Sequence, residues 1–496
     1  MRWAIILLSI LLAASAAAQK VRVTGGIVEG RKSEDGGATI FEGIPFAAPP
    51  LGGNRWRAPQ PVVPWLGTRS AASPPPACLQ NDYQWNHANY LFGSEDCLTL
   101  DVRAQGNVGE KLPVMVWIHG GSNRAGSGSG GVYSRITDQG VVLVTVQYRL
   151  GIFGFLSHRK LAEEQGGSSG NYGLMDQIAA LKWMQSNIAS FGGDPGNVTI
   201  FGESAGSQDV SLLLAAPPAR GLFHKAIMQS GTPKFGMKSR PLSDAFKLGD
   251  QVDEIGDSKG DITTLRRMSA HALLAADLRL NDEALWSKEF VWLRPIIDGV
   301  VLPRDPGELL AQAPPRPVII GTNRFEFGPT KGTIDVAAYA KHWFGAQAAA
   351  ALELYRSEEQ GVDPRLGHLE GRMETDVVFR CPAKNLAAQL ASLGWPVWRY
   401  EFDVGPDDGT PSGGLTSHAY EISFIMDRKP VGPGSAAAQM QDYWVSFAKS
   451  GVPGGLGRTK WPSFTQTSKA YALFDRKGMT AMKNLRPAHC ALVDAI

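Results

Sequence analysis

Short apolar segments that alternate with helical patterns are the feature that most constrains how this chain can fold. Residues 113–119, 141–148 and 198–201 are nearly continuous apolar runs, typical of strands buried on both faces of a sheet. The same rhythm continues in the helical patterns 174–188 and 205–214 and in the apolar runs 226–230 and 317–321. This alternation predicts an α/β fold, with a large, mostly parallel mixed sheet flanked by helices.

Two regions depart from this rhythm. Residues 21–29 and 38–46 form short alternating patterns that predict an N-terminal β region. Residues 233–310 are helical and more polar, and we expect an excursion that packs over the sheet and its functional site. A chain of 496 residues is long enough for three domains, but no repeat or convincing linker divides it. We therefore predict a single domain over residues 19–496.

The first eighteen residues have the pattern of a signal peptide. Met1-Arg2 supplies a positive start, residues 4–14 are apolar, and residues 16–18 offer an A-x-A cleavage site. A retained membrane anchor is the alternative, but the apolar stretch is short for a bilayer. We expect an exported protein, periplasmic or secreted, that begins at Gln19. No later segment resembles an 18-residue apolar span, so we expect no stable membrane insertion after cleavage.

The cysteines become informative once export is assumed. The chain has four, Cys78, Cys97, Cys381 and Cys490, and an even count in an exported protein favours two disulfides. The count alone allows three connectivities, of which the sequential pairing Cys78–Cys97 and Cys381–Cys490 is the simplest. No C-x-x-C motif or histidine cluster points to a metal site.

The charge balance excludes one broad class of function. The formal net charge is +2, whereas a nucleic-acid-binding protein usually presents a strongly basic surface. We therefore expect no nucleic-acid partner.

The pentapeptide Gly-Glu-Ser-Ala-Gly at residues 202–206 is the strongest chemical signal. It follows the apolar run 198–201 and precedes a helical pattern, which is the context of a nucleophile elbow. Small residues flank the serine because such a turn is sharp, and the helix directs backbone N–H groups toward a developing negative charge. Ser204 is therefore the candidate nucleophile.

A nucleophilic serine needs a base and an acid, which follow an elbow serine in the order acid, then histidine. Among nine histidines, His418 stands in a polar, Gly-rich loop (411–420) just before the apolar residues 422–425. Glu326 follows the predicted strand 317–321, at the edge of the sheet where site residues collect. Each of the two could instead be an ordinary surface residue. If His418 is the base, activity should fall as the pH drops through roughly 6–7.

A second glycine-rich turn ends the predicted strand 113–119. Its sequence is His119-Gly120-Gly121-Ser122, and glycines allow the backbone to approach a substrate carbonyl with free N–H groups. The pattern indicates an oxyanion-binding loop, although an ordinary glycine turn would have the same appearance.

Taken together, these motifs resemble the type-B carboxylesterase family of the α/β-hydrolase superfamily, which includes para-nitrobenzyl esterases and cholinesterases. The similarity covers nearly the whole mature chain. The matching segments are 41–47, 49–52, 95–101, 148–151, 154–155, 170–177, 191–206, 447–448, 451 and 461–462.

The resemblance implies an activity and a set of roles. It implies a serine carboxylester hydrolase for small-molecule esters that needs no cofactor or metal. Ser204, Glu326 and His418 match the family's triad, and Gly121, Ser122 and Ala205 match its oxyanion donors. The family's cysteine pairing agrees with the sequential one.

Two positions depart from the family pattern. Arg103 stands where the family usually has an apolar residue in the signature around Cys97. Asn123-Arg124 stands where the family usually has aromatic or apolar residues, directly after the expected oxyanion donors Gly121 and Ser122. Arg124 is a candidate contact for a substrate carboxylate, which would favour half-esters of dicarboxylic acids. The alternative is that it pairs with a nearby acid or reaches solvent.

Two other classes of function compete with the esterase. Residues 126–131 match the G-x-G-x-x-G dinucleotide motif, but they lie several residues beyond the strand end, and no acid for a ribose follows the next strand. A catalytically silent, cholinesterase-like binding protein is the second alternative. All three triad residue types are present, which favours the enzyme.

Overall fold

The computed structural model describes residues 19–105, 109–282, 294–327, 331–359, 361, 363–406, 414–426, 436–455 and 457–495. The predicted signal peptide, residues 1–18, lies outside the described residues, as do residues 411–413 of the loop that precedes His418. Within the described ranges, no helix combines the length and the apolar character that a membrane span requires.

One large mixed sheet forms the centre of the molecule. Eleven strands lie in the order β14 (Gly478–Lys483), β13 (Ala470–Asp475), β12 (Val397–Asp403), β11 (Val318–Asn323), β10 (Lys225–Gln229), β9 (Gly193–Glu203), β7 (Leu112–Ile118), β8 (Val142–Val146), β6 (Thr99–Ala104), β4 (Thr39–Pro45) and β3 (Arg31–Lys32). The strands from β13 to β8 are parallel, and the outer pairs at both edges are antiparallel. This architecture confirms the predicted α/β fold.

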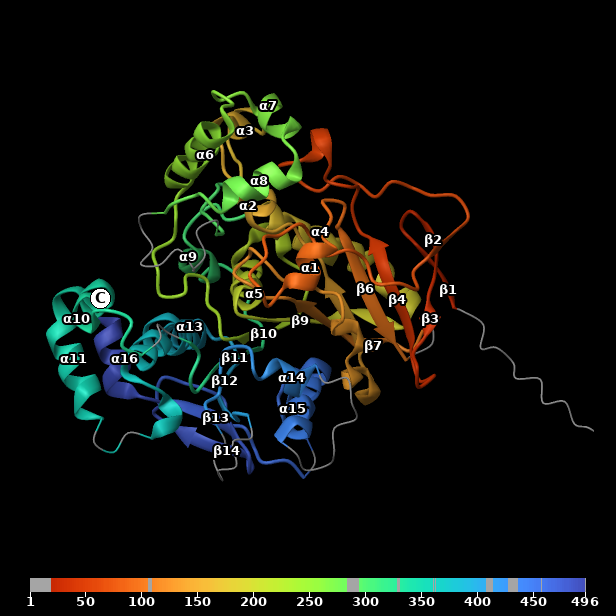
Figure 1. Cartoon of the computed structure of the whole chain (residues 1–496). Helices are drawn as coiled ribbons and strands as arrows, with labels where there is room; N and C mark the ends of the chain where they lie inside the picture. Colours follow the sequence, from red (N-terminus) through yellow and green to blue (C-terminus); the bar gives the residue numbers. More distant parts are fainter. Residues whose placement is uncertain are drawn as a thin grey trace, which may run out of the picture.

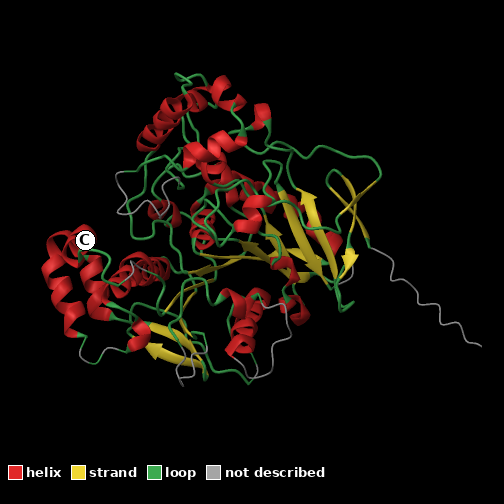
Figure 2. Ribbon diagram, in the orientation of Figure 1, coloured by secondary structure: helices red, strands yellow, loops and turns green. Residues whose placement is uncertain are grey.

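The sheet is buried on both faces because its strands are apolar in both registers. Along β7, Val114 and Val116 belong to one hydrophobic core, whereas Met115 and Trp117 belong to another. Helices α4 (Tyr172–Asn187) and α5 (Ala205–Ala215) cover the first face, and α15 (Ala436–Ser450) covers the second. Figure 1 shows these helices on opposite sides of the strands, and Figure 2 shows the strands between them.

The predicted N-terminal β region divides between two sheets: residues 38–46 contain β4 of the large sheet, and residues 21–29 belong to a small separate sheet. The pattern 21–29 forms a hairpin of β1 (Lys20–Val23) and β2 (Gly26–Glu29), and β5 (Thr68–Ser70) pairs with β2. The hairpin turns at Gly25, whose positive φ of 100° favours glycine. The small sheet lies beside the edge of the large sheet that β3 and β4 form, opposite the edge that β13 and β14 form (Figure 1).

Two helical excursions interrupt the strand order. The predicted one, between β10 and β11, contains α6 (Leu242–Gly256), α7 (Ile262–Arg267), α8 (Ala270–Asp277) and α9 (Pro306–Leu310). A second, which the sequence pattern did not reveal, lies between β11 and β12 and contains α10 (Val336–Phe344), α11 (Ala348–Ser357), α12 (Leu369–Glu374), a π-helical turn (Thr375–Arg380) and α13 (Cys381–Ser392). The remaining α-helices are α1 (His87–Leu91), α2 (Gly151–Phe155), α3 (Arg159–Glu164), α14 (Ile422–Ile425) and α16 (Pro487–Asp494).

The cysteines pair sequentially in the structure. Cys78 is bonded to Cys97, and Cys381 at the start of α13 is bonded to Cys490 in α16. The second bond joins residues 109 positions apart and attaches the C-terminal helix to the second helical excursion.

Removing the Cys381–Cys490 bond should lower the free energy of unfolding substantially. Its large loop restricts the unfolded chain, an effect of about 3–5 kcal/mol. The measurement is equilibrium urea unfolding of the Cys381→Ala/Cys490→Ala variant beside wild type, with peptide mapping of the non-reduced protein. Unchanged stability, or four free thiols in protein purified from an oxidising compartment, would contradict the expectation.

Candidate active site

Ser204 stands on a sharp turn between β9 and α5. Its backbone has φ 55° and ψ −124°, a conformation that a non-glycine residue adopts only under strain. The turn lies against the end of β7, and Cβ atoms at Gly202 and Gly206 would come within 2.6 Å and 2.1 Å of the Ile118 carbonyl oxygen. Glycine is therefore required on both sides, and the serine is held at the carboxyl edge of the sheet.

The loop after β7 lies beside this turn in a left-handed conformation. Gly121, Ser122 and Asn123 have φ values of 107°, 58° and 55°. The Gly121 carbonyl accepts hydrogen bonds from the N–H groups of Arg124 and Ala125, which closes the turn. Across from it, Ala205 begins α5, and the first N–H groups of a helix have no acceptor within the helix.

The acid and the histidine predicted from the sequence are in direct contact. Oε2 of Glu326 lies 2.7 Å from Nδ1 of His418. The other carboxylate oxygen accepts hydrogen bonds from Ser230 Oγ at 2.7 Å and from the Asn323 backbone N–H at 2.8 Å. Glu326 is 1% exposed, so these bonds hold a buried carboxylate in one orientation.

The other ring nitrogen of His418 faces a residue that the sequence analysis did not single out. Nε2 lies 3.1 Å from Oε1 of Glu203, but it forms no hydrogen bond with any described residue. Burial of the ring favours neutral imidazole. The Glu203 carboxylate, the hydrogen bond that Nδ1–H donates to Glu326, and the charges of Glu326 and Glu421 outweigh this effect and raise the pKa of His418 to about 9. Burial also raises the pKa of Glu203.

The surroundings of His418 raise the pH below which we expect activity to fall. A base must be neutral to accept a proton, so kcat/KM should fall as the pH drops below the pKa of His418, which lies above the 6–7 expected from an ordinary imidazole. Glu203→Gln removes the carboxylate beside Nε2, lowers the pKa of His418 and should shift the acidic limb of the profile to lower pH. The measurement is the pH dependence of kcat/KM for both proteins. Identical midpoints would contradict a charge effect of Glu203 on His418.

Several further residues position the histidine. The buried Glu421 accepts hydrogen bonds from the side chains of Asn323 and Gln229, which fixes the turn after His418. The imidazole packs against Phe327 and Phe379, with ring centroids 4.8 Å and 5.1 Å away. Glu203 stands inside the Gly-Glu-Ser-Ala-Gly motif at residues 202–206, whereas no local sequence signal marked the two phenylalanines.

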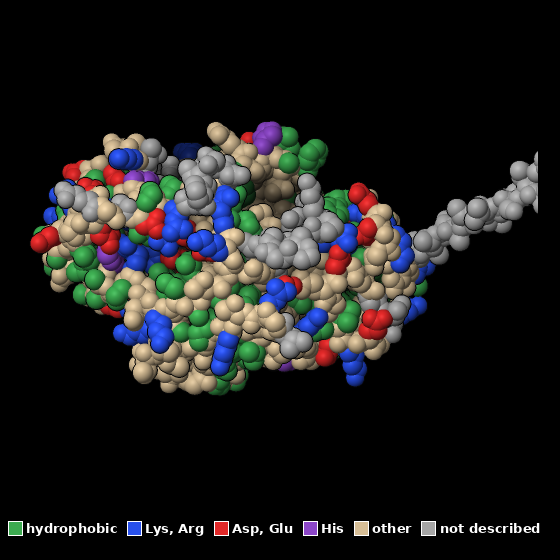
Figure 3. Space-filling model, turned by 90° about the horizontal axis from the view of Figure 1, so that it is seen from below, with side chains coloured by type: hydrophobic (Ala, Val, Ile, Leu, Met, Phe, Trp, Pro, Cys, Tyr) green, Lys and Arg blue, Asp and Glu red, His purple; other side chains and the backbone are tan. Residues whose placement is uncertain are grey.

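Ser204, Glu203 and His418 line one open cavity. Its volume is about 860 Å³, and the Gly120–Ser122 backbone forms part of its wall. The remaining lining residues are Trp85, Asn89, Trp117, His119, Gly126, Ser127, Ser129, Gly130, Gly131, Phe327, Ala419, Ile422 and Met426. Figure 3 shows the molecule hollowed on the face seen from below.

The two departures from the family pattern have structural partners. Arg103 donates a hydrogen bond to Thr137 and lies 3.9 Å from Asp35. Arg124 is 4% exposed, donates to the Tyr83 hydroxyl and lies over the Tyr83 ring, 4.6 Å from its centroid. Because Arg124 does not line the cavity of Ser204, the structure does not support the predicted contact with a substrate carboxylate.

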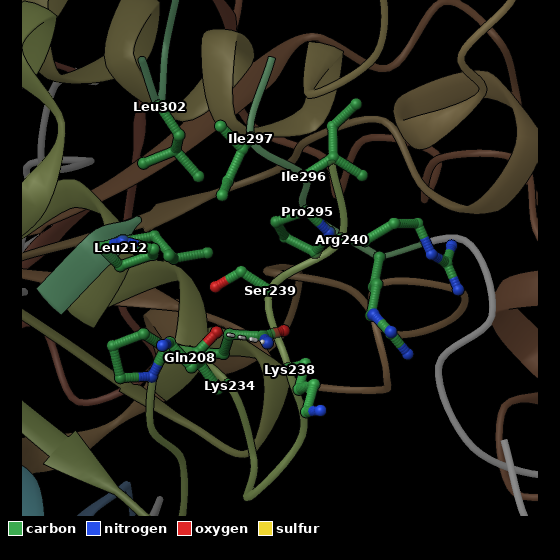
Figure 4. A pocket seen from close by; sticks show the side chains of 13 residues that line it. Gln208, Leu212, Lys234, Lys238, Ser239, Arg240, Pro295, Ile296, Ile297 and Leu302 are labelled. Atoms are coloured by element: carbon green, nitrogen blue, oxygen red, sulfur yellow. Dashed lines mark hydrogen bonds between the residues drawn. The ribbon is translucent and has the colours of Figure 1, made fainter. Parts of the chain in front are cut away.

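A second, much smaller cavity lies beside α5. It is lined by Gln208, Leu212, Pro233, Lys234, Lys238, Ser239, Arg240, Arg294, Pro295, Ile296, Ile297, Leu302 and Pro306 (Figure 4). It shares no lining residue with the larger cavity, which Ser204, His418 and the Gly120–Ser122 backbone line.

The glycine-rich segment 126–131 does not have the surroundings of a dinucleotide-binding turn. Residues 126–131 contribute to the wall of the large cavity, and a 3-10 turn (Gly131–Tyr133) follows them rather than the α-helix of a dinucleotide-binding unit. Within the described ranges, no group of three or more His, Cys, Asp or Glu side chains is arranged to hold a metal ion.

Comparison with known proteins identifies the family. The carboxylesterase family model matches residues 17–493. The chain belongs to the carboxylesterase family. It is 36% identical to the fumonisin B1 esterase of Sphingopyxis macrogoltabida over 474 residues, which cover 88% of this chain and 83% of the relative.

A bacterial esterase is similar over a still larger share of both chains. The para-nitrobenzyl esterase of Bacillus subtilis is 34% identical over 476 residues, which cover 92% of this carboxylesterase and 95% of the relative. A solved PNB esterase structure superimposes with a TM-score of 0.81 at 31% identity, covering 96% of this chain and 100% of the other. The protein is therefore a carboxylic ester hydrolase of the α/β-hydrolase superfamily.

Proposed function

We propose that this carboxylesterase hydrolyses small-molecule esters through an acyl-enzyme on Ser204. The observation that carries the proposal is the hydrogen-bonded pair of Glu326 and His418, beside the cavity that His418 and Ser204 both line. The contact that the proposal requires is the one between the base, His418, and the nucleophile, Ser204. In enzymes without bound substrate, such a hydrogen bond is often long, and it tightens when the substrate binds.

The reaction proceeds in two halves. Nε2 of His418 accepts the hydroxyl proton of Ser204 as Oγ attacks the ester carbonyl, and the same nitrogen then gives that proton to the leaving alcohol. In the second half, His418 takes a proton from a water that attacks the acyl carbonyl, and it returns this proton to Ser204 Oγ as the bond to the acyl group breaks and the acid leaves. Throughout, Glu326 holds the imidazole in the tautomer with the proton on Nδ1 and stabilises its positive form.

The oxyanion donors in this proposal are the N–H groups of Gly121, Ser122 and Ala205. The loop after β7 lies against the turn at Ser204, because a Cβ atom at Gly120 would come within 3.1 Å of the Ser204 Cβ, and the α5 dipole favours negative charge there. Such preorganised donors stabilise the tetrahedral intermediates of both halves.

We further propose that residues 1–18 direct export and are removed, leaving residues 19–496 as one domain in the periplasm or outside the cell. The two disulfides support this compartment because such bonds persist in oxidising environments.

Active-site titration with an organophosphate tests the mechanism and separates it from the catalytically silent alternative. One equivalent should be incorporated, with loss of activity in proportion, and peptide mapping should find the modification on Ser204. Full activity after treatment, or modification at another residue, would contradict the proposal.

A further inference from the structure

The oxyanion site of this carboxylesterase is assembled from two separate elements. The loop after β7 supplies Gly121 and Ser122, and α5 supplies Ala205. A change in the spacing of these elements moves the donors relative to each other, and displacements of about 1 Å in such sites cost roughly 100-fold in rate.

A buried hydrogen bond joins the two elements directly. Nδ2 of Asn123 donates to Oδ1 of Asp209 at 3.0 Å, and both residues are 0% exposed. Asp209 comes four residues after Ala205 on α5, so it lies on the same face of the helix one turn further along. Asn123 directly follows Ser122, so the bond spans from one set of donors to the other.

Two further contacts hold this bond in place. Nε2 of Gln177 on α4 donates to Oδ2 of Asp209 at 2.6 Å, which fixes the carboxylate from its other side. The Asn123 carbonyl accepts a hydrogen bond from the Gly151 N–H at 2.7 Å. Asn123 also has a φ of 55°, a left-handed value that asparagine tolerates better than most residues.

We propose that Asn123 and Asp209 are positioning residues that set the spacing between the oxyanion loop and α5. This inference rests on the proposed function. Neither side chain lines the cavity of Ser204, so neither is expected to contact substrate.

Asn123→Gly and Asp209→Ala test the clamp formed by these two residues. Glycine accepts the left-handed backbone, so the first variant removes the side chain without adding strain. Each variant should lower kcat by about 30-fold with KM nearly unchanged, because the donors act mainly in the transition state. A trifluoromethyl ketone that forms a tetrahedral adduct with Ser204 should bind more weakly by a similar factor.

Two additional variants separate positioning from general stability. In Asp209→Asn, the new amide oxygen can still accept from Asn123, and the new NH₂ group then faces Gln177. Oε1 of Gln177 is buried with no hydrogen-bond partner among the described residues, so it can accept from this NH₂ group if the Gln177 amide turns. This variant should therefore recover most of the kcat lost in Asp209→Ala. Asn187→Ala removes another buried asparagine, which donates to the Trp183 carbonyl, and should lower the melting temperature without changing kcat.

The double variant Asn123→Gly/Asp209→Ala should be no slower than the slower single variant, since both changes remove the same bond. Wild-type kcat in Asn123→Gly, an effect on KM alone, or independent effects in the double variant would overturn the clamp. The Ser204→Ala variant separates a failure of the clamp from a failure of the proposed function, because activity retained in that variant would overturn the acyl-enzyme on Ser204.

Discussion

Replacing Ser204 with alanine should lower kcat by at least about 10⁴-fold, because no acyl-enzyme can form without the hydroxyl. The fold should persist, since the change removes one oxygen atom at the carboxyl edge of the sheet. The measurement is steady-state hydrolysis of a chromogenic ester by the purified variant, with its melting temperature recorded beside wild type.

Ser211, on the helix α5 that follows Ser204, provides a matched control. Its hydroxyl donates to the Gln208 carbonyl at 2.6 Å, away from the large cavity. Ser211→Ala also removes one hydroxyl oxygen, here from α5, and should retain nearly full activity. Comparable activity in both variants would show that ester hydrolysis does not depend on Ser204.

Replacing Glu326 with glutamine should have the next largest effect, a loss of about 10³–10⁴-fold in kcat. The amide oxygen can still accept from Ser230 and from the Asn323 N–H. The amide NH₂, however, would face Nδ1 of His418 and favour the tautomer protonated on Nε2, which cannot take a proton from Ser204. The measurement is kcat with the same ester, at a pH above the acidic limb of the wild-type profile.

The size of the loss separates tautomer control from general weakening of the site. Ser230→Ala removes one hydrogen bond to Glu326 without changing its charge, and it should cost far less than Glu326→Gln. Glu353→Gln makes the same chemical change at an exposed position on α11 and should leave kcat unchanged. A Glu326→Gln variant within tenfold of wild type would mean that another group orients His418.

The local elements were predictable because their signals repeat along a few neighbouring residues. The apolar run 198–201 followed by Gly-Glu-Ser-Ala-Gly predicted the end of β9, the turn at Ser204 and the start of α5. Two-sided burial requires apolar residues in both registers of a strand, so the central parallel strands also stood out. The second helical excursion did not, since its helices are short and its π-helical turn follows no simple period.

Chain order and motif similarity identified Glu326 and His418, but their contact depends on packing. They are 92 residues apart in sequence, and only the pairing of β11 with its neighbours brings the ends of their loops together. The approach of Glu203 to Nε2 of His418 is a consequence of the same packing, and with it the raised pKa of the histidine.

The α/β fold class, the family resemblance, the nucleophile elbow and the glycines that its close packing requires could all be predicted from the sequence. The directions of the polar side chains around the elbow could not, because they depend on tertiary packing. Arg124 turns to Tyr83 rather than to the cavity, and Asn123 joins Asp209 on α5. The physical reason is the sequence separation of the interacting residues. Helices, strands and turns depend on neighbouring residues, whereas the partners of a buried polar side chain come from distant segments that pack against it.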